Sequence, residues 1–167
     1  KRQHLVMAVP NVFFHDAGPI ARMRPLATGD DGKAVPLEDL DIDSFGVSTY
    51  NQYSWRQLID GWSCTSCARC QDVCPAYASG KGLNPMQVIH DVRNYANDHA
   101  PILLSGGQPD ETILERITEE AVWACTTCNA CVDVCPLYIE HVPKLTDLRR
   151  NAMMETMEYP EVLNTAM

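Results

Sequence analysis

The eight cysteines of this 167-residue chain have the type and spacing of ligands for iron–sulfur clusters. They form two runs with one shared spacing, Cys-x2-Cys-x2-Cys-x3-Cys-Pro, and no cysteine lies outside these runs. The runs are Cys64, Cys67, Cys70, Cys74, Pro75 and Cys125, Cys128, Cys131, Cys135, Pro136. This spacing binds [4Fe–4S] clusters, in which each iron takes one thiolate. The sequence therefore predicts two [4Fe–4S] clusters and transfer of single electrons.

The fourth cysteine of each run predicts how the ligands are shared. Three cysteines at intervals of three residues can surround one side of a cluster, and the fourth ligand then comes from elsewhere. In two-cluster ferredoxins the fourth cysteine of each run ligates the other cluster. We therefore expect a crossed arrangement, with iron ligands Cys64, Cys67, Cys70 and Cys135 for the first cluster and Cys125, Cys128, Cys131 and Cys74 for the second.

Two other interpretations of the cysteines are less well supported. Zinc sites favour pairs of cysteines separated by longer loops, whereas here three cysteines fall within seven residues, twice over. A disulfide framework is typical of secreted and usually shorter chains. A structural cluster or zinc module in an interaction protein is nevertheless a class of function to test against a redox protein. Iron and sulfide content separates the two.

The similarity of the two runs extends beyond the cysteines. Residues 62–77 align with residues 123–138, which indicates an internal duplication with one unit for each cluster. The tryptophans and tyrosines of these segments either shield the clusters from water or fill the core. Arg69 in the first run corresponds to Ala130 in the second. Since a nearby cation favours the reduced cluster, we expect the first cluster to be the more easily reduced.

Helical patterns must position the two runs. Ser54 and Gln57 form a capping box, and Tyr53 and Leu58 can form the hydrophobic staple of the same helix. The apolar residues that share one face of this helix are Trp55, Leu58, Ile59 and Trp62. Asn84-Pro85 begins a second helix, with proline at its first position. The buried stripe that we expect on it is Val88, Ile89, Val92, Tyr95 and Ala96.

Two further helices are predicted around the second run. Residues 110–122 form the first, and residues 142–157 form the second, which Pro160 ends. The residues expected to face inward are Ile113, Leu114, Ile117, Ala121, Leu145, Leu148, Ala152 and Met153. A mostly α fold, an α-helical ferredoxin with two cluster-binding loops, therefore fits better than a small βαββαβ ferredoxin, whose runs are separated by strands and turns.

The chain outside the helices divides into three predicted parts. Residues 1–26 form an extended N-terminal arm, residues 27–53 an acidic linker, and residues 159–167 a tail, around a ferredoxin domain at 54–158. The arm is apolar and is flanked by cations, namely Lys1, Arg2, Arg22 and Arg24. This pattern allows contact with a membrane surface, contact with a partner protein, or packing on the chain's own domain.

Charge and hydropathy restrict the partners. The formal net charge is −9, and two oxidised clusters with their thiolates would each add about −2. An acidic protein of this kind is not expected to bind nucleic acid. No apolar run approaches the ~20 residues that span a bilayer, and no secretory signal is visible. The chain begins at Lys1, so we expect a segment of a longer polypeptide.

The cysteine runs and several other motifs resemble a known family. Helix-separated runs of this kind are similar to the α-helical ferredoxin module of the heterodisulfide-reductase C-subunit type. The sequence resembles fused membrane electron-transfer-flavoprotein:(mena)quinone oxidoreductases and heterodisulfide-reductase-related iron–sulfur proteins still more. The motifs outside the cysteines that carry the resemblance are His4-Leu5, Val9-Pro10-Asn11-Val12-Phe13-Phe14, Phe45-Gly46-Val47, Ser54-Trp55-Arg56-Gln57-Leu58 and Ile139-Glu140-His141-Val142.

This resemblance implies a relay of electrons at the cytoplasmic face of a membrane. Its partners would be a flavoprotein or Cys-Cys-Gly catalytic domain and a membrane domain that holds haem b or quinone. The chain has no catalytic residues of its own under this interpretation. The alternative is a free-standing, soluble ferredoxin-like carrier. His141 follows the second run closely, so it is a candidate for a place near a cluster or a docked quinone, with helix capping or packing as the alternative.

Overall fold

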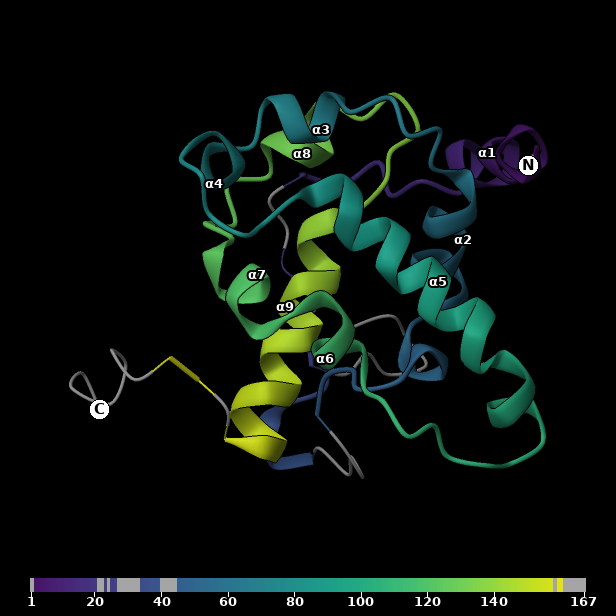
Figure 1. Ribbon diagram of the computed structural model, residues 1–167, viewed down its shortest axis with the longest axis vertical. Coiled ribbons are helices and arrows are strands. Elements are labelled where there is room, and N and C mark those ends of the chain that lie inside the picture. Colours follow the sequence, from purple (N-terminus) through teal and green to yellow (C-terminus); the bar gives the residue numbers. More distant parts are fainter. Residues whose placement is uncertain are drawn as a thin grey trace.

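The computed structural model describes residues 2–20, 23, 25–26, 34–39, 45–157 and 159–160. Every regular element among these residues is a helix (Figure 1), which confirms the mostly α-helical fold class. Lys1, Arg22, Arg24, much of the predicted linker and nearly all of the predicted tail lie outside the described residues. The elements are α1 Gln3–Phe13, η1 Leu37–Asp39, η2 Tyr50–Gln52, α2 Trp55–Ser63, α3 Arg69–Asp72, α4 Pro75–Ala78, α5 Pro85–Leu104, α6 Ile113–Ile117, α7 Glu119–Ala124, α8 Ala130–Asp133, α9 His141–Asn151 and η3 Ala152–Thr156.

The long helix α5 is the main apolar support of the domain. It begins as the sequence predicts, because the Asn84 side chain accepts hydrogen bonds from the backbone N–H groups of Met86 and Gln87, and Pro85 occupies the first turn. Its buried residues include the whole predicted stripe. Tyr95 and Ile89 are fully buried, and α5 packs against α2, α6 and α9 in the middle of the molecule (Figure 1).

Helix α2 has the predicted capping box, but its shared apolar face is not its most buried face. Ser54 accepts a hydrogen bond from the Gln57 N–H, and the Gln57 side chain accepts from the Ser54 N–H. Of the apolar residues predicted to share one face, Trp55 is 60 % exposed and Leu58, Ile59 and Trp62 are half-buried. The side chains that α2 buries are polar ones, Arg56, Gln57, Asp60 and Ser63. Each makes a hydrogen bond to another part of the chain, which offsets the cost of burial.

A buried ion pair joins α2 to α9. Asp60 and Lys144 are both fully buried, and the Lys144 ammonium donates to the Asp60 carboxylate. The same carboxylate accepts from the Asn11 side chain at 3.0 Å and from the Glu140 N–H at 3.3 Å. Lys144 also donates to the Glu140 carbonyl oxygen at 3.0 Å. The charges are therefore paired with each other and with neutral groups, as buried charges must be.

Helix α1 lies within the segment that the sequence describes as an extended arm. It is fastened by polar contacts: Asn11 is fully buried and donates to Asp60 and to the Leu137 carbonyl oxygen, both at 3.0 Å. The Ser63 hydroxyl donates to the Met7 carbonyl oxygen at 2.9 Å. The apolar residues of α1 that point outward are Leu5, Val6, Val9 and Phe13, each more than 60 % exposed. The helix is thus attached by its polar side and presents its apolar side.

The predicted helix over 110–122 is divided in two. Helices α6 and α7 meet at Thr118, whose φ of 75° is unusual for a β-branched residue. The Thr118 hydroxyl accepts a long hydrogen bond from the Ala121 N–H, at 3.4 Å, and so caps α7. All of the predicted inward residues, Ile113, Leu114, Ile117 and Ala121, are buried.

The last helix also changes character before its predicted end. Helix α9 stops at Asn151, and residues Ala152–Thr156 continue as a π-helical turn. Leu145, Leu148 and Ala152 are buried as predicted, but Met153 is 37 % exposed, so its predicted inward position is wrong. A π turn changes the angle between successive side chains, which accounts for the outward shift of Met153.

The Phe45-Gly46-Val47 motif closes the domain against this end of α9. The Val47 N–H donates to the Asp147 carbonyl oxygen at 3.1 Å, and the Asn151 side chain donates to the Phe45 carbonyl oxygen at 3.0 Å. Gly46 has a φ of +72°, and a Cβ at this position would lie 2.2 Å from the Asp147 carbonyl oxygen. Only glycine permits so close an approach of the two backbones.

Candidate iron–sulfur centres

The two cysteine loops have the same backbone conformation. Ser66 and Ala68 in the first loop have φ values of 58° and 65°, and Thr127 and Asn129 in the second have 54° and 61°. The N–H of Ser66 donates to Cys64 Sγ, and the N–H of Thr127 donates to Cys125 Sγ, each at 3.4 Å. Left-handed residues that alternate in this way curl the loop around a centre. The sequence duplication therefore has a structural counterpart.

Each loop leads into a short helix and then into a proline-started segment. Helix α3 follows Ala68 and helix α8 follows Asn129, and the two helices lie side by side at the top of Figure 1. Their pairing brings the two runs together although they are far apart in the sequence. The fourth cysteine of each run, placed just after its short helix, thereby reaches the loop of the other run.

Two cavities result, and each has four cysteines in its wall. Cys64, Cys67, Cys70 and Cys135 line the first cavity, together with Met86, Leu137 and Ile139. Cys74, Cys125, Cys128 and Cys131 line the second cavity, together with Leu83, Val142 and Leu145. Each cavity combines three cysteines of one run with the fourth cysteine of the other run. These are the two sets of residues that the sequence predicts as crossed ligands.

The donor set and its surroundings fit a [4Fe–4S] cluster. Four thiols meet one cavity with apolar side chains around them, as a water-protected cluster requires. Within the described part of the chain, no three His, Cys, Asp or Glu side chains converge closely enough for a single metal ion. A cluster has four irons, so its ligands do not need to converge on one point.

Burial affects the thiols of both cavities in the same direction. Burial raises the pKa of Cys70 to about 11 and the pKa of Cys131 to about 12, and neighbouring thiols add to both shifts. Cys67 and Cys128, in contrast, are exposed at the outer edges of the loops. Because ligation requires thiolates, binding of iron to the buried cysteines releases protons.

Side chains from α5 approach the first cavity. His90 Nε2 lies 3.7 Å from Cys64 Sγ and 3.0 Å from the Ser66 hydroxyl. Burial lowers the pKa of His90, and the charge of Arg93 adds to this effect. Arg69, the cation that the sequence places in this loop, lines the first cavity and is exposed.

A cation from α9 supports the second loop. The Arg149 guanidinium donates to the carbonyl oxygens of Val122 and Cys125, and it lies over the Trp123 ring with 5.4 Å to the ring centroid. Its charge acts to lower the pKa of the Cys125 thiol, although burial gives that thiol a raised pKa overall. The sequence did not single out Arg149. No local pattern marks it, since its partners lie 24 and 27 residues away.

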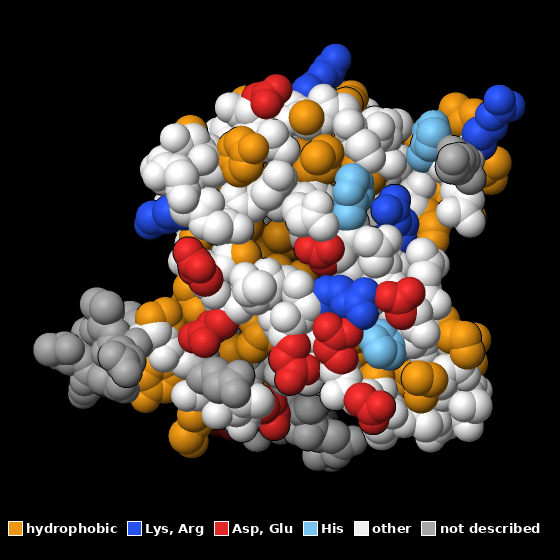
Figure 2. Space-filling model, in the orientation of Figure 1, with side chains coloured by type: hydrophobic (Ala, Val, Ile, Leu, Met, Phe, Trp, Pro, Cys, Tyr) orange, Lys and Arg blue, Asp and Glu red, His pale blue; other side chains and the backbone are white. Residues whose placement is uncertain are grey.

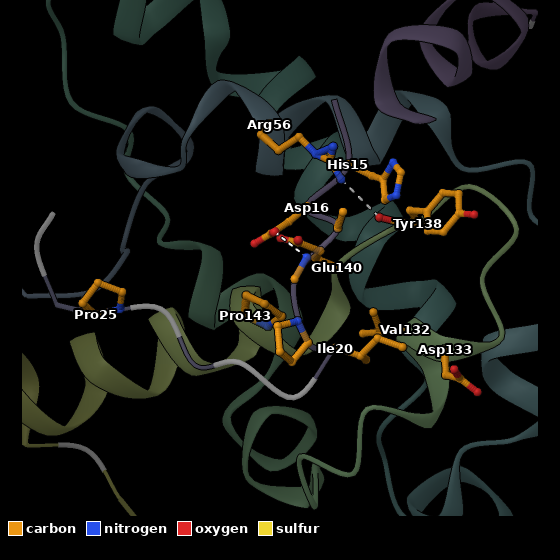
Figure 3. A pocket seen from close by; sticks show the side chains of 13 residues that line it. His15, Asp16, Ile20, Pro25, Arg56, Val132, Asp133, Tyr138, Glu140 and Pro143 are labelled. Carbon is orange, nitrogen blue, oxygen red and sulfur yellow. Dashed lines mark hydrogen bonds between the residues drawn. The ribbon is translucent and has the colours of Figure 1, made fainter. Parts of the chain in front are cut away.

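The segment after Cys135 is held from outside by Arg56 and His15. The Arg56 guanidinium donates to the Asn11 carbonyl oxygen at 3.0 Å and to the Tyr138 carbonyl oxygen at 3.4 Å. The His15 ring stacks on the Tyr138 ring with 4.2 Å between centroids. Figure 3 shows these side chains around a separate pocket of about 450 Å³, which Glu140 also lines. The N-terminal segment and α2 thus together fix the segment that follows Cys135.

The paired aromatic residues do not line the cluster cavities. Tyr77 and Tyr138 are 42 % and 46 % exposed. Trp62 and Trp123 are half-buried, and Trp123 packs against the main apolar core. Of the two roles considered for these residues, the described structure favours packing over direct shielding of the cavities.

His141 lies beside both cysteine cavities, which the sequence offered only as one of two alternatives for this residue. It is the first residue of α9, it is 2 % exposed, and it lines both cysteine cavities. Lys144 and Asp60, which the sequence did not single out, lie next to it in the buried pair described above. The sequence did contain a signal for this pair. Asp60 and Lys144 are charged residues at inward positions of their helices, and a charge there is rare unless it is paired.

Comparisons with known proteins agree with this geometry. Residues 56–136 match the family described as "4Fe-4S dicluster domain". The chain is 34% identical, over 96% of its length, to the EtfAB:quinone oxidoreductase of Syntrophomonas wolfei subsp. wolfei, and covers 24% of that protein. It is 34% identical, over 76% of its length, to a probable membrane-anchored ferredoxin of Chromohalobacter salexigens, and covers 22% of that protein.

A third relative is shorter. It is the C-subunit of the ferredoxin:CoB-CoM heterodisulfide reductase of Methanosarcina mazei, to which the identity is 32% over 62% of the chain and 53% of the relative. The chain thus spans about a quarter of the length of the first two relatives and about half of the third. No solved structure matches the chain. Among the described residues, no helix has the length and apolar character needed to cross a membrane.

Proposed function

We propose that this chain, whose residues 56–136 match the 4Fe–4S dicluster domain family, is the internal electron relay of a larger membrane-associated oxidoreductase. The domain carries two [4Fe–4S] clusters and transfers electrons. We further propose crossed ligation, with Cys64, Cys67, Cys70 and Cys135 at the first cluster and Cys74, Cys125, Cys128 and Cys131 at the second. When bound, the clusters accept and release one electron at a time.

One observation carries the proposal of a paired relay. The two cavities are built from the same two loops, and each loop contributes a cysteine to the cavity of the other. Crossing therefore keeps the two sites adjacent, with His141 in the wall of both. The contribution of the chain is to hold the sites close together, to keep water out with apolar side chains, and to set their relative potentials.

The partners are proposed from the relatives and from the surface. The names of the relatives include EtfAB, quinone and heterodisulfide. We propose that a flavoprotein or a Cys-Cys-Gly catalytic domain exchanges electrons with one cluster, and that a membrane domain with haem b or quinone exchanges them with the other. This arrangement corresponds to the cytoplasmic face of a membrane.

The outward side of α1 is the proposed contact with the membrane part. Leu5, Val6, Val9 and Phe13 are 63, 68, 69 and 77 % exposed, and the exposed Phe14 ring contacts the exposed Trp55 ring at 5.4 Å between centroids. Polar contacts hold the inner side of the helix. Contiguous exposed apolar surface on a folded domain is typical of interaction sites.

The face of the molecule shown in Figure 2 differs in charge from the apolar outward side of α1. Acidic side chains gather over its lower half, where α6 and α7 run in Figure 1. Asp98, Glu111, Glu115, Glu119 and Glu120 belong to this region, and Arg116 pairs with the first two. Such a surface is suited to a basic patch on a soluble redox partner. The two contacts of the relay would then lie on different surfaces.

Spectroscopy and iron content test the relay. The purified chain is expected to contain about eight irons and eight sulfides, and the reduced protein is expected to give two interacting EPR spectra. A colourless zinc protein would end the proposal. Binding to vesicles that contain the membrane domain of a relative separates the relay from a free-standing carrier. Phe13→Ser in α1 is expected to weaken this binding, whereas Leu104→Ser, at an equally exposed position of α5, serves as the matched control.

A further inference from the structure

His141 lies where the two cysteine cavities meet. The first cavity is closed by Met86, Leu137 and Ile139, and the second by Leu83, Val142 and Leu145. His141 is the one residue that lines both cavities among the described residues. It starts α9 directly after Ile139 and Glu140, so the backbone fixes it between the loops.

The ring of His141 is buried without a full set of polar partners. Only 2 % of the residue is exposed. Among the described residues, its Nδ1 atom has no partner that meets hydrogen-bond geometry, and the polar backbone group that acts on the ring is that of Ile139. A buried polar atom without a partner costs roughly 1–3 kcal/mol, so it indicates that the ring is placed to meet a group bound at the site. The neighbouring cavities, with four thiols each, are where such a group would bind.

The surroundings of His141 keep the ring neutral. Lys144 lies one helical turn further along α9, where its charge is paired with Asp60. Burial lowers the pKa of His141 to about 4, and the charge of Lys144 acts in the same direction, against the smaller raising effects of Asp60 and the Ile139 backbone. A neutral imidazole still carries one N–H. This N–H can serve as a donor to sulfur without adding a buried charge.

We infer that His141 is a positioning residue shared by both cluster sites, and that its ring N–H donates a hydrogen bond to a sulfur atom in one of the two cavities. This inference rests on the proposed crossed clusters. A donor to sulfur stabilises the more negative, reduced state, so the hydrogen bond raises the reduction potential of the cluster that accepts it. His141, which lines both cavities, thereby adjusts the reduction potentials of the two clusters relative to each other.

Substitution of His141 with the clusters in place tests the inference. In the cluster-loaded chain, His141→Leu removes the donor and keeps an apolar side chain of similar size. The equilibrium constant for reduction of at least one cluster is expected to fall about tenfold, which is 59 mV for one electron. The readout is an EPR-monitored redox titration of both clusters. His99→Leu is the matched control, since His99 is also largely buried but bonds to Glu111 instead, and it is expected to leave both potentials unchanged.

Partial replacements locate the donor nitrogen. His141→Asn places an amide near the position of Nδ1, and His141→Gln places one near the position of Nε2. One of the two is expected to restore the potential that Leu lowers. If His141→Leu holds both clusters at the potentials of the unsubstituted chain, the inference is wrong although the relay stands. If the unsubstituted chain itself holds no pair of clusters, the proposed function fails first.

A measurement that does not need His141→Leu covers the case in which that variant does not fold. Pulsed EPR of the reduced chain with ¹⁵N-histidine is expected to show a weak nitrogen coupling that persists in His90→Gln, because His90 is the other histidine near a cysteine sulfur. Absence of any such coupling in His90→Gln would overturn the inference. A coupling that persists there and disappears in His141→Gln or His141→Asn would support it.

Discussion

The two cluster loops share one backbone conformation but differ in their electrostatic surroundings. Both have alternate left-handed residues, and both have an N–H···S contact of 3.4 Å at their first cysteine. The first loop has exposed Arg69 and faces His90. The second loop has Ala130 at the corresponding place, and Arg149 is bonded to its backbone instead. The duplicated segments thus share the ligand geometry, whereas the charge around each site comes from residues that the two copies do not share, namely Arg69 in the first loop and His90 and Arg149 on helices outside the duplication.

This difference changes how the potentials are compared. From the sequence, Arg69 is the only cation that distinguishes the loops, which predicts that the first cluster is the more easily reduced. Arg149 is less exposed and donates to the Cys125 carbonyl oxygen, so its charge is less screened by water. The prediction for the first cluster remains a prediction, and Arg149 is the group that opposes it.

Removal of iron is expected to have the largest effect, because both loops depend on it. Chelation of iron under anaerobic conditions removes the links between α3, α8 and the rest of the domain. Metal binding of this kind contributes on the order of 10 kcal/mol to folding. The unfolding temperature by circular dichroism is expected to fall by roughly 10 °C or more. An unchanged unfolding temperature would show that the loops hold their shape alone.

Asp60→Asn is expected to have the next largest effect, and it acts on the region between the loops. The change leaves the Lys144 ammonium fully buried without its carboxylate, which costs about 3–5 kcal/mol. Denaturant unfolding of the cluster-loaded chain measures the loss. Asp72→Asn, on the exposed side of α3, is the control and is expected to change the free energy of unfolding by less than about 0.5 kcal/mol. Equal effects would show that the buried pair has no special role.

Arg149→Gln and Arg69→Gln compare the two loops directly. Loss of the cation from Arg149 is expected to lower the potential of the second cluster by about 60 mV, a tenfold change in the equilibrium constant for one electron. Loss of exposed Arg69 is expected to lower the potential of the first cluster by less. Redox titration of each variant measures both values. A larger shift for Arg69→Gln would restore the ranking that the sequence alone predicts.

Substitution of Arg116, whose surface ion pairs contact neither loop, is expected to have the smallest effect. Hydrogen bonds from Arg116 lower the pKa of Glu111. A lowered carboxyl pKa stabilises the fold at pH values above the ordinary value of 4.5, and this contribution is lost as pH falls through the folded pKa. Arg116→Gln should remove less than about 1 kcal/mol at pH 7. Unfolding temperatures of the variant and the parent chain at pH 7 and pH 4 measure this loss of stability. The difference between the two chains is expected to be smaller at pH 4.

Cluster-loaded samples of Arg116→Gln also provide a control for the potentials. Both clusters are expected to keep the potentials of the parent chain. A shift in either would mean that long-range charge, and not the contacts of each loop, determines the difference between the sites.

Local patterns predicted much of the fold. The apolar stripe of α5 repeats at helical spacing, and its start is marked by Asn84-Pro85, so both follow from neighbouring residues. The buried face of α2 was not predictable in this way. Arg56 and Asp60 are buried because Asn11 and Lys144 meet them, and those partners lie 45 and 84 residues away. The break at Thr118 likewise depends on tertiary packing, since the local sequence continues a helical pattern.

The candidate site shows the same division. The cysteine spacing is sufficient to predict the two sets of four residues, because cluster geometry limits which sulfurs can share an iron core. The groups that adjust the sites lie elsewhere. His90 comes from α5, and Arg149 comes from the later part of α9, the helix that His141 begins. Their places depend on how helices pack around the loops, which the spacing of the cysteines does not specify.

Paired cysteine substitutions test the crossed relay most directly. Cys67→Ala with Cys135→Ala alters one cluster under crossed ligation, so the chain should keep about four irons and one complete [4Fe–4S] spectrum. Cys67→Ala with Cys74→Ala alters both clusters, so neither complete spectrum should remain. Iron content and EPR of the reduced chains give the answer. The reverse outcome, with the second pair keeping one intact cluster and the first pair keeping none, would contradict the crossed arrangement.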